Sequence, residues 1–208
     1  MKHLFIVTLA LLPALLAAQT DAEKIEACFN GYKTAILNGD GEGAERHVDS
    51  KTIQYYNKML DAALHSNKAA VEGMGLIDKI TVLVARVKVP AEEMKTMNGK
   101  SFLIYAVDNG MVGKNSVQNL EFNEANVSGN TATSTMKVNG QVVPFGFEYT
   151  KEDGSWKLDI TSVFEVSEKA FAQVVGQSGM SENEFLLNML GMLTGSTVDE
   201  SVWNPLDQ

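Results

Sequence analysis

The sequence predicts an α+β fold in which N-terminal helices pack on a curved, cone-like antiparallel sheet, with a helical elaboration and further helices at the C-terminus. Three observations support this fold class. Between residues 21 and 110, apolar residues recur at three- and four-residue spacing, which is typical of amphipathic helices. Four short runs with strand-like composition follow, separated by glycine-containing turns, at residues 117–125, 131–139, 143–151 and 155–163. Helix-like periodicity returns in the C-terminal segment 165–208.

Residues 1–18 are typical of a secretory signal peptide. A basic start precedes an apolar stretch from Leu4 to Leu16, which is shorter than the roughly 20 residues that span a bilayer as a helix, and small residues follow it. We expect cleavage after Ala18, so that residues 19–208 form a single exported α+β domain in a periplasm or outside the cell. Later stretches are too short or too polar to predict a membrane span.

The charge of the chain argues against nucleic acid and anionic lipid surfaces as partners. The net charge is −9, and removal of residues 1–18 leaves 16 basic and 26 acidic side chains. Both excluded partner classes require clustered Lys and Arg.

Cys28 is the only cysteine, so an intramolecular disulfide is impossible. We expect Cys28 to be a buried apolar residue, because a reactive thiol needs basic neighbours and Glu23 and Glu26 lie nearby.

The N-terminal part is predicted to begin with three helices. An apolar stripe indicates the first helix from Asp21 to Leu37, and the turn at residues 38–41 ends it. A short second helix occupies residues 42–49. The third helix covers residues 50–66, with Ser50 as its N-cap.

A helical insertion is predicted at about residues 51–110, so that it includes the third helix. After the third helix, the insertion is predicted to continue as three shorter helical segments, which end at Pro90, Gly99 and Gly110. Pro90 suits the first turn of a helix, and each glycine suits a helix C-terminus. The run ITVLVARVKV, residues 80–89, is rich in β-branched residues and is also compatible with a strand.

The hairpin KEDGSWKLDITSVF predicts one strongly apolar sheet face. With Asp153 and Gly154 at the turn, Lys151 pairs with Trp156, Tyr149 with Leu158, and Phe147 with Ile160. Because side chains alternate along a strand, one set faces one way: Phe145, Phe147, Tyr149, Trp156, Leu158 and Ile160. The other face carries Glu148, Thr150, Lys157, Asp159 and Thr161. Glu148 then lies opposite Asp159, either on a solvated outer face or at a weak cation site.

These features together resemble the nuclear transport factor two-like fold, also called cystatin-like or ketosteroid isomerase-like. The features are the long first helix, the short second one after Asn38-Gly39-Asp40-Gly41, and the late meander ending in GSWKLDI. The resemblance covers roughly residues 21–50 and 115–165, whereas residues 69–110 and the C-terminal helices depart from the family's minimal pattern. It implies a curved sheet that wraps the first helix as a cone, whose apolar mouth often holds a small molecule.

The resemblance points to the inside of the cone as a ligand site. The predicted ligand-binding residues are Tyr32, Phe145, Phe147, Tyr149, Trp156 and Leu158. Apolar walls of this kind are typical of a binding pocket and equally of a filled core. The sequence leaves both open.

No catalytic set emerges from the residues. Enzymes of the resembled family use carboxylate or histidine bases and tyrosine donors inside the cone, and an inward base here would have to be a residue such as Asp108 or Glu121. His47 and His65 are eighteen residues apart on different predicted helices, which disfavours a zinc site. Nucleophile-elbow and dinucleotide-binding motifs are absent from the sequence, so we expect no metal and no cofactor.

The C-terminal segment is predicted to contain two helices, from Ser167 to Val175 and from Glu182 to Leu193. Ser181 and Glu184 are spaced as a capping box for the second. Its apolar residues cover more than half of the helix and need burial, either as a lid over the rest of the fold or as an interface with a partner. A homodimer is one arrangement that such an interface allows. Trp203 is the expected anchor of the chain end.

The sequence therefore favours a non-catalytic exported protein that binds a small apolar molecule or a protein partner, through the cone or a helical surface. The alternative is a lyase, isomerase or hydrolase that acts on a small hydrophobic compound inside the cone. An enzyme needs at least one inward ionisable group with a shifted pKa, whereas a binding protein does not. A structural domain with a filled cone is a third interpretation.

Overall fold

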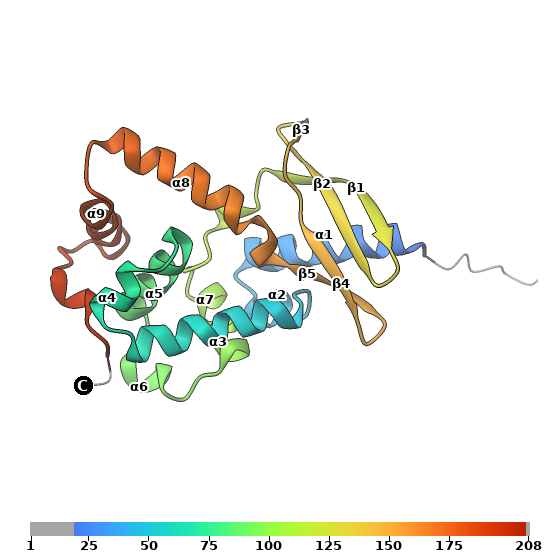
Figure 1. Ribbon diagram of the computed structural model, residues 1–208. Helices are drawn as coiled ribbons and strands as arrows, with labels where there is room; N and C mark the ends of the chain where they lie inside the picture. The colour runs from blue at the N-terminus through green and yellow to red at the C-terminus, as the bar shows by residue number, and fades with distance from the viewer. Residues whose placement is uncertain (1–18, 207–208) are drawn as a thin grey trace, which may run out of the picture.

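The computed structural model describes residues 19–206 and confirms the α+β class. Figure 1 shows an antiparallel sheet beside the first helix at one end of the molecule and a block of helices at the other. The predicted signal peptide lies outside the described residues. Within residues 19–206, every helix is too short or too polar to cross a membrane.

Helices make up the chain before the sheet. Their bounds are α1 (Asp21–Asn38), α2 (Gly41–Glu45), α3 (Ser50–His65), α4 (Lys68–Glu72), α5 (Leu76–Lys88), α6 (Ala91–Met94) and α7 (Gly99–Asp108), followed by the 3-10 turn η1 (Lys114–Ser116). The strand alternative for residues 80–89 is wrong. These residues belong to α5 up to Lys88, because a helix places Val82, Leu83 and Val84 against its neighbours in the core.

The N-cap of α3 is Asp49 rather than the predicted Ser50. The Asp49 carboxylate accepts a hydrogen bond from the backbone N–H of Thr52 at 2.8 Å. The carbonyl of Leu158 accepts a hydrogen bond from the Asp49 N–H, which holds Asp49 in the extended conformation that a cap requires. The N–H and hydroxyl of Ser50 instead donate to the carboxylate of Glu152.

The sheet contains one more strand than predicted. Its strands are β1 (Leu120–Ser128), β2 (Thr131–Val138), β3 (Gln141–Val143), β4 (Glu148–Glu152) and β5 (Ser155–Asp159). They pair in the order β1-β2-β4-β5, and β3 pairs with β2 beyond the end of β4. The predicted strand over residues 143–151 divides because residues 144–147 leave the ladder. Pro144 has no N–H to donate, and Gly146 lies against the carbonyl of Ser134.

The predicted register of the β4–β5 hairpin is confirmed. Asp153 and Gly154 have φ values of 48° and 79°, as a two-residue type I′ turn requires. The observed pairs are Lys151 with Trp156, Tyr149 with Leu158, and Glu148 with Asp159. The predicted pair of Phe147 with Ile160 does not form, because Ile160 begins the 3-10 turn η2 (Ile160–Val163).

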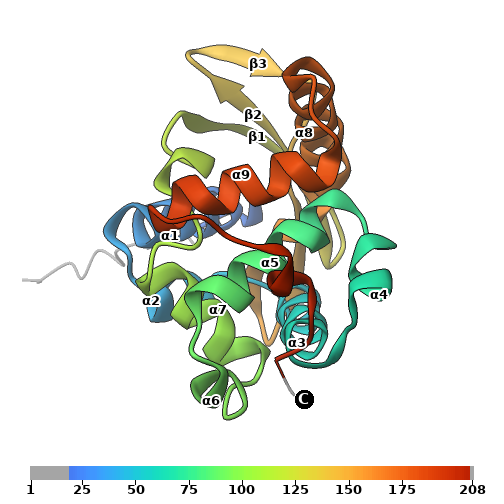
Figure 2. The same ribbon diagram turned by 90° about the vertical axis from the view of Figure 1, so that its left-hand side faces the viewer.

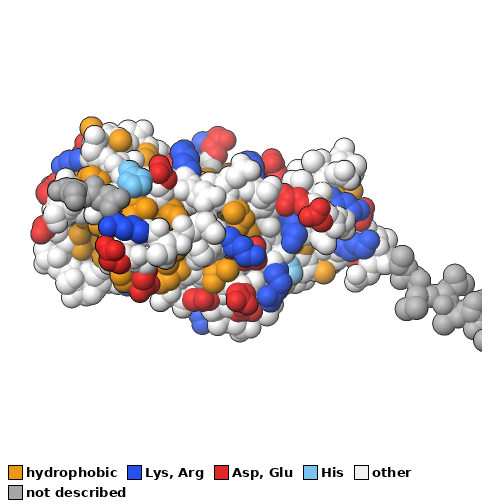
Figure 3. Space-filling model, turned by 90° about the horizontal axis from the view of Figure 1, so that it is seen from below, with side chains coloured by type: hydrophobic (Ala, Val, Ile, Leu, Met, Phe, Trp, Pro, Cys, Tyr) orange, Lys and Arg blue, Asp and Glu red, His pale blue; other side chains and the backbone are white. Residues whose placement is uncertain are grey.

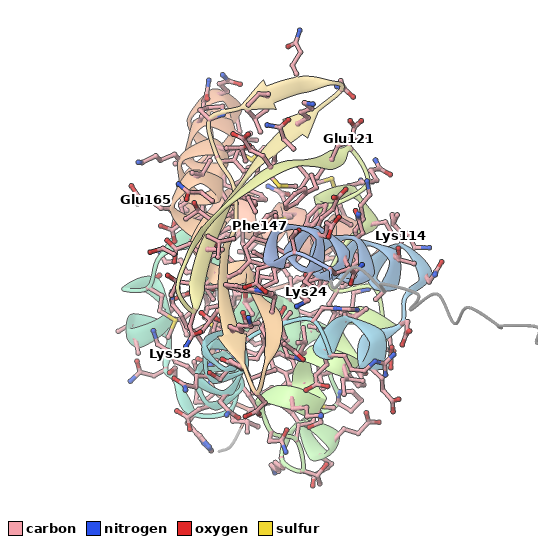
Figure 4. The ribbon with its side chains drawn as sticks, turned by 90° about the vertical axis from the view of Figure 1, so that its right-hand side faces the viewer. Lys24, Lys58, Lys114, Glu121, Phe147 and Glu165 are labelled. Carbon is pink, nitrogen blue, oxygen red and sulfur yellow. The ribbon has the colours of Figure 1, made fainter. Side chains whose placement is uncertain are left out.

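Helix α1 packs against the apolar face of the sheet. Figure 4 shows Phe147 between the sheet and α1, where its ring centroid lies 5.8 Å from that of Phe29. The ring centroid of Phe122 in β1 lies 6.3 Å from that of Phe29. The buried apolar side chains of this part and of the helical block belong to one connected cluster.

Helix α5 lies at the centre of the helical block and contacts the C-terminal helices. These are α8 (Phe164–Ser178), α9 (Glu182–Thr194) and the 3-10 turn η3 (Glu200–Trp203). The predicted capping box of Ser181 and Glu184 is confirmed. Figure 2 shows α9 lying across the block, where Leu186 and Leu190 are buried. Trp203 is fully buried, so the chain end is anchored as expected.

Arg86 of α5 joins the end of α3 to this chain end. Its guanidinium donates to the carbonyls of Ala62, Ala63 and Ser66 in the last turn of α3 and to the carbonyl of Val202. The donor–acceptor distances run from 2.5 to 3.1 Å. The buried cation thus satisfies the carbonyls of Ala63 and Ser66 near the helix end, and adds a second donor to the carbonyl of Ala62, which already accepts from the N–H of Ser66.

Candidate functional site

The six predicted ligand-binding residues come together where α1 meets the sheet. The β4–β5 hairpin and the residue before it contribute Phe147, Tyr149, Trp156 and Leu158, and α1 contributes Tyr32. All of these are buried, whereas Phe145 is half-buried. Their side chains belong to the same apolar cluster as Phe29. The residues therefore share one location, and they lie there as packed core.

The ionisable groups of this inner region are held neutral. Burial raises the pKa of the Tyr32 and Tyr149 phenols far above the ordinary value. The hydroxyl of Tyr149 donates to Ser134 at 3.4 Å. Burial also raises the pKa of the Cys28 thiol to about 12, and its Sγ donates to the carbonyl of His47. Cys28 is thus a buried, unreactive thiol, as the sequence predicts.

Trp156 closes the core beneath the hairpin rather than facing an open space. Its ring is buried, and the ammonium of Lys151 lies 5.4 Å from the ring centroid. The indole Nε1 makes no hydrogen bond of normal geometry to the described residues. The Lys151 ammonium lies 3.1 Å from the Asp21 carboxylate, and the Trp156 indole together with this ammonium lowers the pKa of the Asp21 carboxyl.

The candidate general bases lie away from this interior. Asp108 is exposed, and its carboxylate accepts a hydrogen bond from the N–H of Gly41 at 2.7 Å, at the start of α2. Glu121 is exposed at the start of β1. Neither residue reaches the space between α1 and the sheet, so their role as inward bases has no structural support.

The outer sheet face differs from the solvated face that the sequence suggests. Glu148 is exposed, but Asp159 opposite it is buried and lies 2.6 Å from the ammonium of Lys51 on α3. The Asp159 carboxylate also accepts from the N–H of Thr161. A lysine from a neighbouring helix therefore neutralises the buried carboxylate.

Several apolar side chains are exposed along the two C-terminal helices and the turn between them. None of the 15 residues of α8, all of which the structure describes, is buried. Figure 1 shows α8 along the top edge of the molecule, with no described element on its outer side. We call the following exposed apolar residues the α8–α9 surface: Val166, Phe171, Val174, Met180, Met192 and Leu193. Val174 is 51% exposed and Met192 is 79% exposed.

Polar contacts hold α8 and α9 to the helical block. A carboxylate oxygen of Glu168 lies 3.4 Å from the N–H nitrogen of Ile77, at the start of α5, where negative charge is favoured. The ammonium of Lys79 lies 2.6 Å from Glu182 at the start of α9. A hollow of about 500 Å³ lies beside the end of α9, and Leu187, Met192 and Val198 line it in part.

A second hollow of about 500 Å³ lies between α1 and the segment around α2. We call it the α1–α2 groove. Its lining includes Asn30, Gly31, Thr34 and Asn38 of α1, and Asp40, Arg46 and His47. Gly31 is required for this geometry, because a Cβ atom there would lie 2.3 Å from Nε2 of His47. The imidazole therefore rests directly on the backbone of α1.

We expect His47 to make the protein less stable as the pH falls. Burial, then Lys157 and Arg46, lower the pKa of His47 below its ordinary value of 6.5. The unfolded chain thus binds the proton first, and stability contributed by neutral His47 is lost as the pH falls through about 6.5 and below. Urea unfolding between about pH 7.5 and about pH 5 should show a larger loss for the wild type than for His47→Gln. Equal losses would contradict this expectation.

Among residues 19–206, no three His, Cys, Asp or Glu side chains lie close enough together to hold a metal ion. Comparison with known proteins gives no further assignment: no family model, no curated protein and no solved structure matches this sequence. The resemblance to the nuclear transport factor two-like fold therefore stays a prediction.

The sequence did not predict two features of the surface, the exposed apolar residues of α8 and the α1–α2 groove. The spacing of Val166, Ala170 and Val174 by four residues was the available signal for the first.

Proposed function

We propose that this protein is an exported, non-catalytic binding protein that engages a protein partner through the α8–α9 surface. The observation that carries the proposal is the exposure of α8. A helix in a protein draws most of its stability from packing an apolar face, yet none of the residues of α8 is buried although Val166, Phe171 and Val174 lie on it. A partner that covers these side chains would supply the missing contacts.

The charge of this region specifies the partner's chemistry. Residues 164–206 contain six acidic side chains and one lysine, and Lys79 and Lys68 of the helical block pair with Glu182 and Glu200, so four acids and one lysine remain, a net charge of −3. Figure 4 labels Glu165, which projects from the outer side of α8. The exposed methionines Met180 and Met192 adapt their shape to an incoming apolar face. An acidic, methionine-bearing apolar surface is complementary to a basic amphipathic helix, and we propose that class of partner.

The same charge argues against a homodimer through this surface. Two copies of the α8–α9 surface would bring net charges of −3 together at close range, after Lys68 and Lys79 are counted against Glu200 and Glu182. Juxtaposed like charges disfavour association, while a basic partner gains from the same field. We therefore propose a partner that is a different chain.

The packed state of the inner region favours a protein partner over a small apolar molecule. Trp156, Tyr149 and Leu158 already bury their side chains against one another and against α1. A ligand in that position would have to displace core side chains. An enzyme acting there would in addition need an inward base, whereas Asp108 and Glu121 are exposed.

The proposal is tested by measuring peptide binding to residues 19–208. A fluorescein-labelled amphipathic peptide of about 18 residues, with leucine on one face and lysine on the other, is compared with a matched leucine and glutamate peptide. Fluorescence anisotropy should show saturable binding of the lysine peptide only. The double variant Val166→Gln/Val174→Gln should weaken this binding by about tenfold or more, because two apolar contacts are lost.

Val127→Gln is the matched control for that experiment. Val127 is also an exposed valine, 37% accessible, but it lies near the end of β1, away from α8 in Figure 1. Its replacement should leave binding unchanged. The proposal fails if the α8 double variant binds the lysine peptide as tightly as Val127→Gln does. Sedimentation velocity on the same samples should show a monomer, and a stable dimer lost in the double variant would assign the surface to self-association instead.

A further inference from the structure

We propose that the α1–α2 groove is a binding site for a small polar organic anion, which carries a carboxylate or a phosphate together with hydroxyl groups. This site lies outside the α1–sheet core and is separate from the α8–α9 surface, so it goes beyond the proposed function. Three features of the groove support this site: a fixed backbone beneath it, nitrogen donors without protein partners in its lining, and positive charge beside it.

The backbone at His47 is fixed from two sides. The carbonyl of His47 accepts a hydrogen bond from the N–H of Leu158 in β5 at 2.8 Å. The Sγ of the buried Cys28 also donates to this carbonyl, at 3.4 Å. A binding residue held by both a strand and a helix is positioned before any ligand arrives, which lowers the entropic cost of binding.

The lining of the groove presents donors that the protein itself leaves unused. The Arg46 guanidinium and the His47 imidazole make no hydrogen bond to any residue between 19 and 206, and neither do the side-chain amides of Asn30 and Asn38. A guanidinium offers five N–H donors in a planar fork that matches carboxylate and phosphate oxygens. Because Gly31 lets the imidazole rest on α1, the Arg46 and His47 side chains lie beside the amides of α1.

The electrostatic surroundings favour a negative ligand. The ammonium of Lys157 donates to the backbone carbonyl of Arg46, which places a second cation close to the groove. Figure 3 shows basic side chains gathered beside a histidine on the half of the molecule nearer the N-terminus. Asp40 also lines the groove, but its carboxylate already accepts from the N–H of Gly43 at 2.8 Å as the N-cap of α2. Its charge therefore faces the helix start.

The spacing of the α1 side chains indicates the rest of the ligand. Asn30, Thr34 and Asn38 follow one another at four-residue intervals, so they form a polar row along one side of the helix. Amide and hydroxyl groups in a row suit hydroxyl groups of a ligand whose acidic end meets Arg46. A hollow of about 500 Å³ is within the range that small-molecule sites occupy.

The test follows the imidazole signals of residues 19–208 by proton NMR. This chain contains only His47 and His65, and His65 ends α3 at the far end from α2, so its signal is an internal reference. Gluconate, glucose 6-phosphate and neutral glucose are titrated at constant ionic strength. We expect a saturable shift of the His47 signal with at least one of the two anions and none with glucose. Gluconate alone would assign a carboxylate, and glucose 6-phosphate alone a phosphate.

Arg46→Gln should raise the dissociation constant of the responding anion by about tenfold, because a charged hydrogen bond is lost. Arg46 is exposed, so this variant is expected to fold. Lys58→Gln is the matched control: it also removes one exposed positive charge, from the side of α3 that Figure 4 shows away from α1, and it should bind like the wild type. Equal, non-saturating shifts in the wild type and in Arg46→Gln would overturn the proposal, as would binding of glucose as tight as that of the anions.

Discussion

Replacement of Arg86 by methionine is expected to lower the free energy of unfolding by about 3–5 kcal/mol. The guanidinium donates to four backbone carbonyls, three at the end of α3 and one at Val202. Methionine fills much of the space but donates no hydrogen bond, so the carbonyls of Ala63, Ser66 and Val202 lose this donor, while Ala62 keeps only the N–H of Ser66. The positive charge at the negative end of the α3 dipole is lost as well. Urea unfolding followed by circular dichroism measures the change.

Lys88→Met provides the comparison for Arg86→Met. Lys88 also lies on α5, but it is exposed and donates to a single carbonyl, that of Leu193. Its loss should cost at most about 1 kcal/mol, because water replaces the bond at an exposed position. If Arg86→Met cost no more than Lys88→Met, the four carbonyl contacts would not stabilise the fold. Limited proteolysis near Val202 should in addition be faster in Arg86→Met, because the chain end loses its tether.

Gly146→Ala is expected to destabilise the sheet by about 2–4 kcal/mol. A Cβ atom at residue 146 would lie 1.6 Å from the carbonyl oxygen of Ser134, which belongs to β2. The clash involves backbone on both sides, so a side-chain rotation cannot relieve it. The neighbouring hydrogen bond from the N–H of Ser134 to the carbonyl of Phe147, at 2.8 Å, would have to lengthen. Thermal unfolding and amide exchange at Ser134 measure the effect.

Gly113→Ala is the matched glycine control. Gly113 has an ordinary φ of −73°, and a Cβ atom there would meet nothing within 4 Å. Its replacement should be neutral or slightly stabilising, because alanine restricts the unfolded chain. Similar melting temperatures for the two alanine variants would contradict this prediction, because they would mean that β2 can move away from a Cβ atom at residue 146 without loss of stability.

The register of the β4–β5 hairpin was predictable because it depends on local rules. An Asp-Gly turn needs two residues with positive φ, and the alternation of side chains then assigns Tyr149, Trp156 and Leu158 to the same buried face. The capping box at Ser181 and the burial of Trp203 were predictable for similar reasons. Each follows from residues that are close in sequence or from strong apolar character.

The errors occur where distant parts of the chain meet. Asp49 replaces Ser50 as the N-cap of α3 because the carbonyl of Leu158, more than a hundred residues later, fixes its backbone. The strand predicted over residues 143–151 divides because Gly146 approaches β2. Asp159 is buried rather than solvated because Lys51 reaches it from α3. Local helix and strand propensities cannot predict such contacts, because each contact joins parts of the chain that are distant in sequence.

The candidate sites likewise combine features that the sequence predicted with features that depend on contacts between distant residues. The sequence indicated that the second C-terminal helix is apolar and needs burial, but only the structure places its Leu186 and Leu190 in the core and shows that Val166 and Val174 of α8 are exposed. It likewise indicated an apolar sheet face, and the packing of α1 decides that this face is filled. The α1–α2 groove had no sequence signal, since it depends on contact between Gly31 of α1 and His47 in the turn that follows α2.

The sequence by itself determined the fold class, the helical nature of the N-terminal and C-terminal parts, and the inward face of the hairpin, because periodicity and turn chemistry act over a few residues. The tertiary structure alone decided which apolar faces are covered and which polar groups keep free donors. Burial depends on the neighbours that the whole chain supplies, and those neighbours can lie more than a hundred residues away, as Val202 does from Arg86.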